Sequence, residues 1–246
     1  MTVPPSIIVV RPEPGNAATV AAAQALGLEV VGQPIFAVQP VDWTCPDPQD
    51  FDALIVGSAN IFRQGGANLA RLRALPVHVV GAATAQEAER AGFRVATTGA
   101  GGLQAVLNTL SHQRLLRLAG AEHIPLTPPQ GTTITTRVVY AVKPLPLPPE
   151  LMDLLNKGAV VLLHSGEAAK HFAAQCDAAM IQRERISLAC LAPRIAESAG
   201  NGWKYIEIAK ETTDSALLAL AAQMCQNAIA RDKQGSALTG NSRPHD

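Results

Sequence analysis

Hydroxyl-bearing residues follow short apolar runs at three glycine-containing turns. At the carboxyl end of a parallel strand, such a turn presents backbone N–H groups and the start of the next helix, which together bind anions without a charged side chain. A Ser or Thr there can equally be a plain helix cap. The sequence therefore predicts either carboxylate-binding loops or ordinary helix starts at the turns Gly57-Ser58-Ala59-Asn60, Gly81-Ala82-Ala83-Thr84 and Ser165-Gly166.

Arg11 follows the first apolar run, Ile7–Val10, and precedes a proline. Its guanidinium could bind a carboxylate through two parallel hydrogen bonds. The alternative is an arginine on the surface before a proline turn. Both interpretations stay open from the sequence.

The cysteines do not suggest a metal site. The chain has four, and they are widely scattered, without a C-x-x-C pair or histidines at ligand spacing. We interpret them as small, partly buried thiols in a reducing compartment. They are Cys45, Cys176, Cys190 and Cys225.

Charge and hydropathy argue against nucleic acid and membranes as partners. Lys plus Arg number 20 and Asp plus Glu number 20 in 246 residues, so there is no basic surface for nucleic acid or anionic membranes. The run Ile7–Val10 is too short for a signal peptide, and no stretch approaches the roughly 20 apolar residues that span a bilayer. We expect a cytoplasmic protein.

Short β-branched runs alternate with Ala-rich helical segments, which predicts an α/β fold with parallel sheets. The runs are apolar throughout, so we expect the strands to be covered on both faces. Helices are expected, for example, over Ala17–Leu26 and Ala83–Ala91. The expected strands include Ile7–Val10, Ala53–Val56, Val77–Val80, Val160–Leu163 and Tyr205–Ile208.

The sequence repeats itself loosely. Residues 51–58 resemble 158–165, each ending on a serine, and residues 79–92 align with 187–200 without a gap. This predicts two similar lobes. Two proline-flanked segments, 34–40 and 136–144, are expected to cross between them.

The crossings set the lobe boundaries. One lobe is discontinuous, comprising 1–35 and 145–230, and the second comprises 40–136. The polar tail 231–246 is expected to be disordered.

An ordered series of motifs resembles the uroporphyrinogen-III synthase family, from the start of the chain to about residue 228. The sequences of Leu118–Gly120 and Leu162–Gly166 resemble those of the alphaproteobacterial branch of the family. The resemblance implies two flavodoxin-like lobes with parallel sheets, joined by a two-stranded β-ladder, with the active site in the inter-lobe cleft. The motifs are Val9–Pro14, Leu26–Pro34, Ala53–Asn60, Val80–Ala85, Val138–Tyr140 and Ser165–Gly166.

The same resemblance implies a chemistry. Enzymes of this family cyclise hydroxymethylbilane, a linear tetrapyrrole octa-acid, to uroporphyrinogen III in tetrapyrrole biosynthesis, with loss of water and inversion of ring D through a spiro intermediate. No cofactor is implied. The enzyme's task is then mainly to hold a flexible substrate in one productive conformation. The resemblance also implies a monomer, which could receive its substrate from hydroxymethylbilane synthase.

Tyr140 matches the family tyrosine of the second crossing, and the resemblance implies that its phenol donates a hydrogen bond to the departing hydroxyl. The alternative is a strand tyrosine packed on a lobe. The chain departs from the family at Leu118–Pro125, where an Arg-containing turn is missing, and at Ala189–Arg194, where Arg194 could replace a Thr-Thr turn. The implied substrate-binding residues are Arg11, Ser58, Asn60, Gly81, Thr84, Ser165 and Gly166.

Two other classes of protein were weighed. A cofactor-independent racemase has two α/β lobes and a pair of cleft cysteines, but the counterpart of Cys190 in the repeat is Ala82. A two-lobed binding protein would need a signal sequence or a nucleotide motif, and Gly99–Gly102 lacks the glycine spacing for the latter. Both remain alternatives that the residues disfavour.

Overall fold

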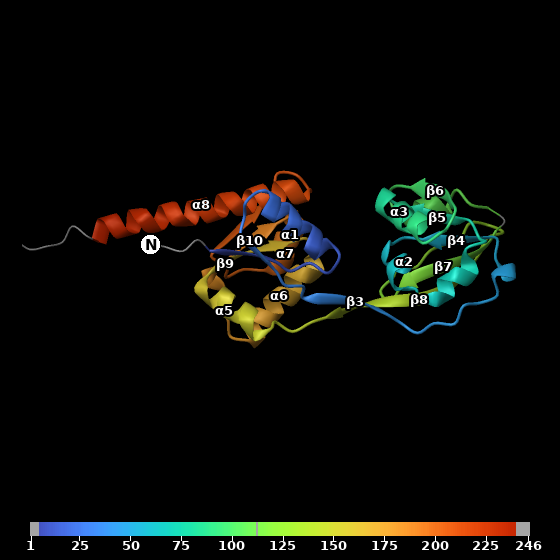
Figure 1. Cartoon of the computed structure of the whole chain (residues 1–246), viewed down its shortest axis with the longest axis horizontal. Coiled ribbons are helices and arrows are strands. Elements are labelled where there is room, and N and C mark those ends of the chain that lie inside the picture. The colour runs from blue at the N-terminus through green and yellow to red at the C-terminus, as the bar shows by residue number, and fades with distance from the viewer. Residues whose placement is uncertain (1–4, 112, 240–246) are drawn as a thin grey trace, which may run out of the picture. The chain divides into compact units, whose positions relative to one another are not determined.

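The computed structural model describes residues 5–111 and 113–239 (Figure 1). Residues up to Ala37, together with those from Pro144 onward, form one compact unit, called unit 1, and Val38–Lys143 form unit 2. The chain passes between the units within strand β3 (Phe36–Pro40) and at the end of strand β8 (Thr133–Pro144). Each unit has its own sheet and its own apolar core.

Unit 1 contains a five-stranded, fully parallel sheet in the order β11-β10-β9-β1-β2. Its strands are β1 (Ser6–Val9), β2 (Val30–Gly32), β9 (Ala159–Leu163), β10 (Ile186–Cys190) and β11 (Tyr205–Ile208). Its helices are α1 (Gly15–Ala25), α5 (Pro149–Lys157), α6 (Gly166–Ala178), η3 (Arg183–Arg185), α7 (Pro193–Ala199) and α8 (Asp214–Thr239).

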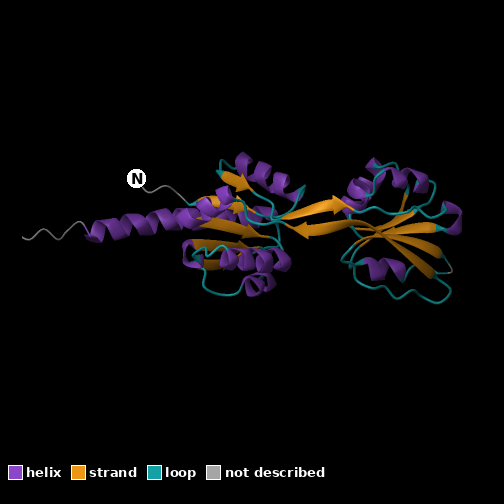
Figure 2. Ribbon diagram, turned by 90° about the horizontal axis from the view of Figure 1, so that it is seen from below, coloured by secondary structure: helices purple, strands orange, loops and turns teal. Residues whose placement is uncertain are grey.

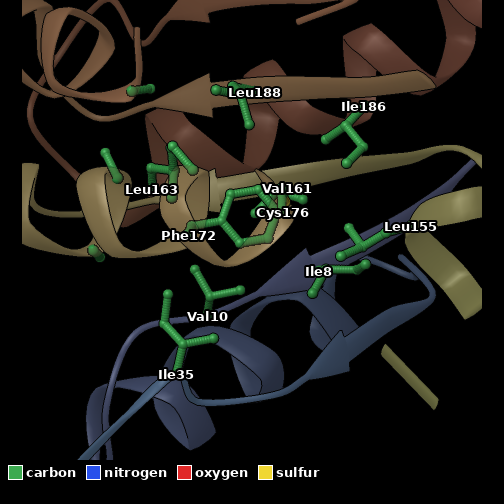
Figure 3. Close-up of a cluster of buried hydrophobic side chains, with 14 of the residues drawn as sticks. Ile8, Val10, Ile35, Leu155, Val161, Leu163, Phe172, Cys176, Ile186 and Leu188 are labelled. Carbon is green, nitrogen blue, oxygen red and sulfur yellow. The ribbon is translucent and has the colours of Figure 1, made fainter. Parts of the chain in front are cut away.

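Helices cover both faces of this sheet, as Figure 2 shows. Successive residues of a strand point to opposite faces, so Ile8 joins the core under α5, α6 and α7 while Ile7 joins the core under α1 and α8. Phe172 of α6 is fully buried beside Val161 in the first of these cores (Figure 3). Burial on both faces explains why the inner strands β1, β9 and β10 are almost entirely apolar, whereas the edge strand β11 is partly exposed and contains Glu207.

Unit 2 contains a six-stranded sheet in the order β3-β8-β7-β4-β5-β6, in which β8 through β6 are parallel. Backbone hydrogen bonds join Ile35 to Leu145 and Val41 to Val139. The residue number rises along one segment while it falls along the other, so β3 is antiparallel to β8. Its other strands are β4 (Ala53–Val56), β5 (Val77–Val80), β6 (Val95–Gly99) and β7 (Arg114–Gly120). Its helices are η1 (Pro48–Asp50), α2 (Asn60–Gln64), η2 (Ala67–Leu72), α3 (Ala82–Arg90) and α4 (Leu103–Leu107).

The α/β class and the two lobes are confirmed, with one mixed sheet. Unit 2 extends past the expected end at 136 because β8 stays paired with β7 as far as Tyr140. Helix α8 continues to Thr239 and so includes residues 231–239 of the tail that was expected to be disordered. Residues 240–246 lie outside the described part of the chain.

Candidate functional site

A pocket of about 460 Å³ lies in unit 2 at the carboxyl edge of the sheet. Its walls come from the turn after β4, the start of α4, the end of β7 and the loop 121–132 that follows β7. Its volume is typical of small-molecule sites, and the carboxyl edge is where parallel sheets bind ligands. The lining residues are Gly57, Ser58, Ile61, Gly101, Gly102, Leu103, Gln104, Arg117, Leu118, Ala119, Gly120, Glu122, His123, Ile124, Pro125, Leu126 and Tyr140.

Two of the residues predicted from the sequence, Ser58 and Tyr140, line this pocket together. The hydroxyl of Ser58 accepts a hydrogen bond from the backbone N–H of Asn60, with the two atoms 3.3 Å apart. Tyr140 is paired with Gly120 between β8 and β7 and is half-buried. Strands β4 and β8, which are not neighbours in the sheet, therefore bring a hydroxyl and a phenol to one cavity.

Loop 121–132 connects two parallel strands without a helix, and polar side chains attach it to the rest of unit 2. His123 Nδ1 lies 2.8 Å from Gly120 O, which can only accept, so Nδ1 carries the proton. The side chain of Gln104 binds the backbone of Thr127 twice, donating to its O at 2.8 Å and accepting from its N at 2.9 Å. These bonds fix the outer wall of the pocket.

Arg117 is the residue that the sequence interpretation missed. It lies on β7 between Leu116 and Leu118, is only 7 % exposed, and donates a hydrogen bond from NH2 to Ile124 O at 2.9 Å. Burial lowers the pKa of its guanidinium from the usual value. The available signal was a charged residue inside the apolar run Arg114–Gly120, where a buried arginine needs a specific reason.

The remaining predicted residues of unit 2 do not line this pocket. Asn60 begins α2, and its Oδ1 accepts a hydrogen bond from Arg63 at 3.3 Å. Gly81 caps α3 with a φ of 80°, which favours glycine, and Thr84 is buried in the first turn of that helix. Their positions at a strand end are as expected, whereas their contact with substrate stays a prediction.

In unit 1, Arg11 lies at the carboxyl end of β1 but is paired inside the unit. Its NH1 lies 3.0 Å from Asp214 Oδ1 at the start of α8. Thr19 donates to Asp214 Oδ2 at 2.6 Å, and His164 Nε2 lies 3.1 Å from Asp214 Oδ1. This polar cluster connects β1, α1, β9 and α8, so the carboxylate that Arg11 binds in this structure belongs to the protein.

Ser165 and Gly166 both have structural roles at the start of α6. The hydroxyl of Ser165 accepts a hydrogen bond from the N–H of Ala168 at 3.2 Å, which makes Ser165 the helix cap. A Cβ at Gly166 would lie 2.8 Å from Ser198 Oγ of α7, so the absence of a side chain permits close packing of α6 and α7. Substrate contact by either residue is untested.

The cysteines are poor acid–base catalysts in this structure. Cys190 and Cys176 are fully buried, and burial raises the pKa of each thiol to about 12. A buried, protonated Cys190 does not suit the two-thiol racemase, and Ala82 supplies no partner thiol.

Within the described ranges, no three His, Cys, Asp or Glu side chains are grouped as metal ligands. None of the described helices is long and apolar enough to cross a membrane.

Two α/β units joined by two strands, with a pocket of small-molecule size at the carboxyl edge of the unit 2 sheet, are typical of a two-lobed α/β protein that binds a small molecule. The sequence model of the family HEM4, described as uroporphyrinogen-III synthase HemD, matches residues 17–219. The chain therefore belongs to the uroporphyrinogen-III synthase family, whose members are cyclising lyases that form uroporphyrinogen III.

One solved structure in particular supports the fold. The uroporphyrinogen-III synthetase of Helicobacter pylori matches with a TM-score of 0.61 and 18 % identity over 89 % of this chain and 99 % of that one. A mutant uroporphyrinogen III synthase of Thermus thermophilus matches with a TM-score of 0.49 and 15 % identity over 91 % and 99 %. Among curated proteins, no sequence match is found.

Proposed function

We propose that the chain converts hydroxymethylbilane to uroporphyrinogen III by holding it in the conformation that leads to the spiro intermediate, with Tyr140 assisting loss of water. The observation that carries this mechanism is the position of Tyr140 in the wall of the unit 2 pocket, in a chain of this family. A hydrogen bond from the phenol to the departing hydroxyl eases cleavage of the C–O bond, and the hydroxyl leaves as water. The pyrrole nitrogen loses its proton in the same step, so that water departs in net and the ring left behind is an electrophilic azafulvene.

The remaining steps need positioning more than proton transfer. The substituted carbon of ring D attacks the azafulvene to give the spiro compound, which fragments and closes again with ring D inverted. The competing reaction, attack by the unsubstituted carbon, needs no enzyme and gives isomer I. Selection between them requires the reacting carbons to be held at near-attack distance, which is the kind of catalysis that a preformed pocket supplies.

The substrate's carboxylates are proposed to bind at strand-end loops of both units. In unit 2 these are the turns that contain Ser58, Asn60, Gly81 and Thr84, where backbone N–H groups at helix starts favour anions. In unit 1 they are Arg11 and the turn of Ser165 and Gly166 at the start of α6. These loops lack a dense basic cluster, which agrees with the formal net charge of zero.

The decisive assay supplies hydroxymethylbilane made in situ by its upstream synthase and resolves the uroporphyrinogen isomers by chromatography. We expect isomer III from the wild type and isomer I from the reaction without enzyme. Formation of isomer I alone in the presence of the folded protein would refute the proposed function. Boiled protein is the matched control, because it retains every buffer component.

We further propose that the protein works as a cytoplasmic monomer of the alphaproteobacterial type that accepts substrate from hydroxymethylbilane synthase. A neutral charge balance suits a protein that binds a small molecule. Size-exclusion chromatography with light scattering tests the monomer. Direct handover predicts that inactive hydroxymethylbilane synthase, added in excess, slows the coupled reaction by occupying the docking surface.

A further inference from the structure

Arg117 is a buried cation without an acidic partner among residues 5–111 and 113–239. Arg117 is only 7 % exposed, yet no described carboxylate lies within ion-pair distance of it. Its one hydrogen bond within the described chain goes from NH2 to Ile124 O. The buried Nε has no partner at all among those residues.

Such an arrangement is costly unless something outside the chain compensates for it. Removing a charge from water carries a penalty of several kcal/mol, which proteins offset with a counter-charge and complete hydrogen bonding. Arg117 has neither. Its neighbours in the adjacent strands, Ile55 of β4 and Thr136 of β8, supply no negative charge.

The pocket beside Arg117 can supply the missing partner. Arg117 lines the same cavity as Ser58 and Tyr140, so a ligand that reaches the phenol also reaches the guanidinium. A planar guanidinium fork binds a carboxylate through two parallel hydrogen bonds, and such pairs are strongest where water is excluded. An arginine that binds an anionic ligand should be buried, should line the pocket and should keep unused hydrogen-bond donors in the free protein. Arg117 meets all three conditions.

We propose that Arg117 binds a side-chain carboxylate of the substrate inside the unit 2 pocket and so orients the ring that carries it. The ligand class is a pyrrole with acetate or propionate arms, which rests on the proposed function. The segment Leu118–Pro125 contains no arginine, and Arg117 immediately precedes it in β7.

The competing explanation is that Arg117 only braces loop 121–132 through Ile124. Gln104 offers a control for stability, because its side chain braces the same loop at Thr127 without carrying a charge. Gln104 also lines the pocket, so only the melting temperature of Gln104→Met is compared with that of Arg117→Met. The two explanations differ in their effect on stability. A brace should stabilise the free protein, whereas an unpaired buried charge should not, so Arg117→Met should leave the free protein at least as stable as the wild type.

The test compares the wild type with Arg117→Met, Arg117→Lys and Gln104→Met. Kinetics with hydroxymethylbilane made in situ give KM, kcat and the isomer ratio, and fluorescence titration gives the affinity for uroporphyrin III, a stable octacarboxylate. For Arg117→Met we expect KM and the dissociation constant to rise about 10- to 100-fold, the effect of losing one charged hydrogen-bonded pair. We expect kcat to change by less than about threefold.

Arg117→Lys should recover part of the affinity, since it keeps the charge but loses the fork. An unchanged KM and affinity in Arg117→Met would overturn the proposal, as would a melting temperature well below that of the wild type, or no binding of uroporphyrin III by the wild type. If the wild type forms only isomer I, the proposed function fails, and the uroporphyrin titration still decides whether Arg117 binds carboxylates.

Discussion

The phenol of Tyr140 lies against the backbone of Gly120, its partner in the ladder between β7 and β8. A Cβ built at Gly120 would come 2.6 Å from Tyr140 Cζ and 2.9 Å from its hydroxyl oxygen. The absence of a side chain at Gly120 therefore sets the position of the proposed catalytic hydroxyl.

Gly120→Ala should displace the end of the Tyr140 ring and lower kcat with little loss of stability, because the ring can move away from the added methyl group. Rates for Gly120→Ala, Tyr140→Phe and the double variant test this relationship. We expect the two effects to be strongly non-additive, since both remove the same hydroxyl from the site. Additive effects would mean that the methyl group acts elsewhere.

Tyr140→Phe should reduce kcat by about 100-fold, at the low end of the range for a lost proton donor. The affinity for product should change much less, because the ring remains. Tyr205 is the only other tyrosine and lies on β11 of unit 1, so Tyr205→Phe is a matched control. Equal losses in kcat and product affinity would make Tyr140 a packing residue.

Substitutions at Ser165 can distinguish its role as a helix cap from a role in substrate binding. Ser165→Ala should lower the free energy of unfolding by about 1 kcal/mol, the usual cost of a lost helix cap. Ser165→Asn and Ser165→Asp should both restore stability, but the aspartate should raise KM for an anionic substrate if the turn contacts it. Chemical denaturation and steady-state kinetics measure the two quantities. The same KM for both variants would limit Ser165 to its capping role.

Arg11 and Asp214 should be energetically coupled. Both side chains are about one-third exposed, so a double-mutant cycle with Arg11→Gln and Asp214→Asn should give a coupling of about 1 kcal/mol or less. If Arg11 also binds substrate, as we propose, KM should rise in Arg11→Gln more than in Asp214→Asn. Parallel changes in KM would leave Arg11 with only the structural pairing.

His164 should make unit 1 less stable in mild acid. Burial, and then the charge of Arg11, lower the pKa of His164 from 6.5 to about 4, despite the opposing effect of Asp214. As the pH falls through this window the unfolded chain takes up the proton first, so stability is full above about pH 6.5 and decreases towards pH 4, by up to about 3 kcal/mol. His164→Gln should remove this component.

The two tryptophans make the measurement specific, because Trp43 lies in unit 2 and Trp203 in unit 1. In a Trp43→Phe background, Trp203 fluorescence during urea denaturation reports unit 1. Burial also lowers the pKa of His78 in unit 2, which the substitution leaves unchanged. The same pH dependence with and without His164 would contradict the assignment.

Much of the fold follows from local pattern. The alignment of residues 79–92 with 187–200 corresponds to β5 and α3 in unit 2 and to β10 and α7 in unit 1. Apolar runs between glycine turns identify such elements because the inner strands of each sheet are buried on both faces. Pairing is harder to predict: the sequence suggested that 136–144 leaves unit 2, whereas its contact with β7 keeps it there.

The site was only partly predictable. Ser58 and Tyr140 could be named because each sits at a recognisable strand motif, and they line one pocket. Arg117 was harder to name, because a charge inside an apolar strand indicates a special role but does not show which face it occupies or what it contacts there. Nor could the pairing of Arg11 with Asp214 be foreseen, since the two residues are 203 positions apart and meet only through the tertiary structure.

The interrupted course of unit 1 has a consequence during synthesis. β1 emerges from the ribosome first, yet in its sheet it lies between β2 and β9, and β9 is made only after the whole of unit 2. Unit 2 can thus fold as a continuous insert before β9 is made. During that time Ile7, Ile8 and Val9 of β1, which are buried in the finished protein, lack the strand with which they pair. Translation speed through 38–143 sets how long that apolar strand stays open to chaperones or to other nascent chains.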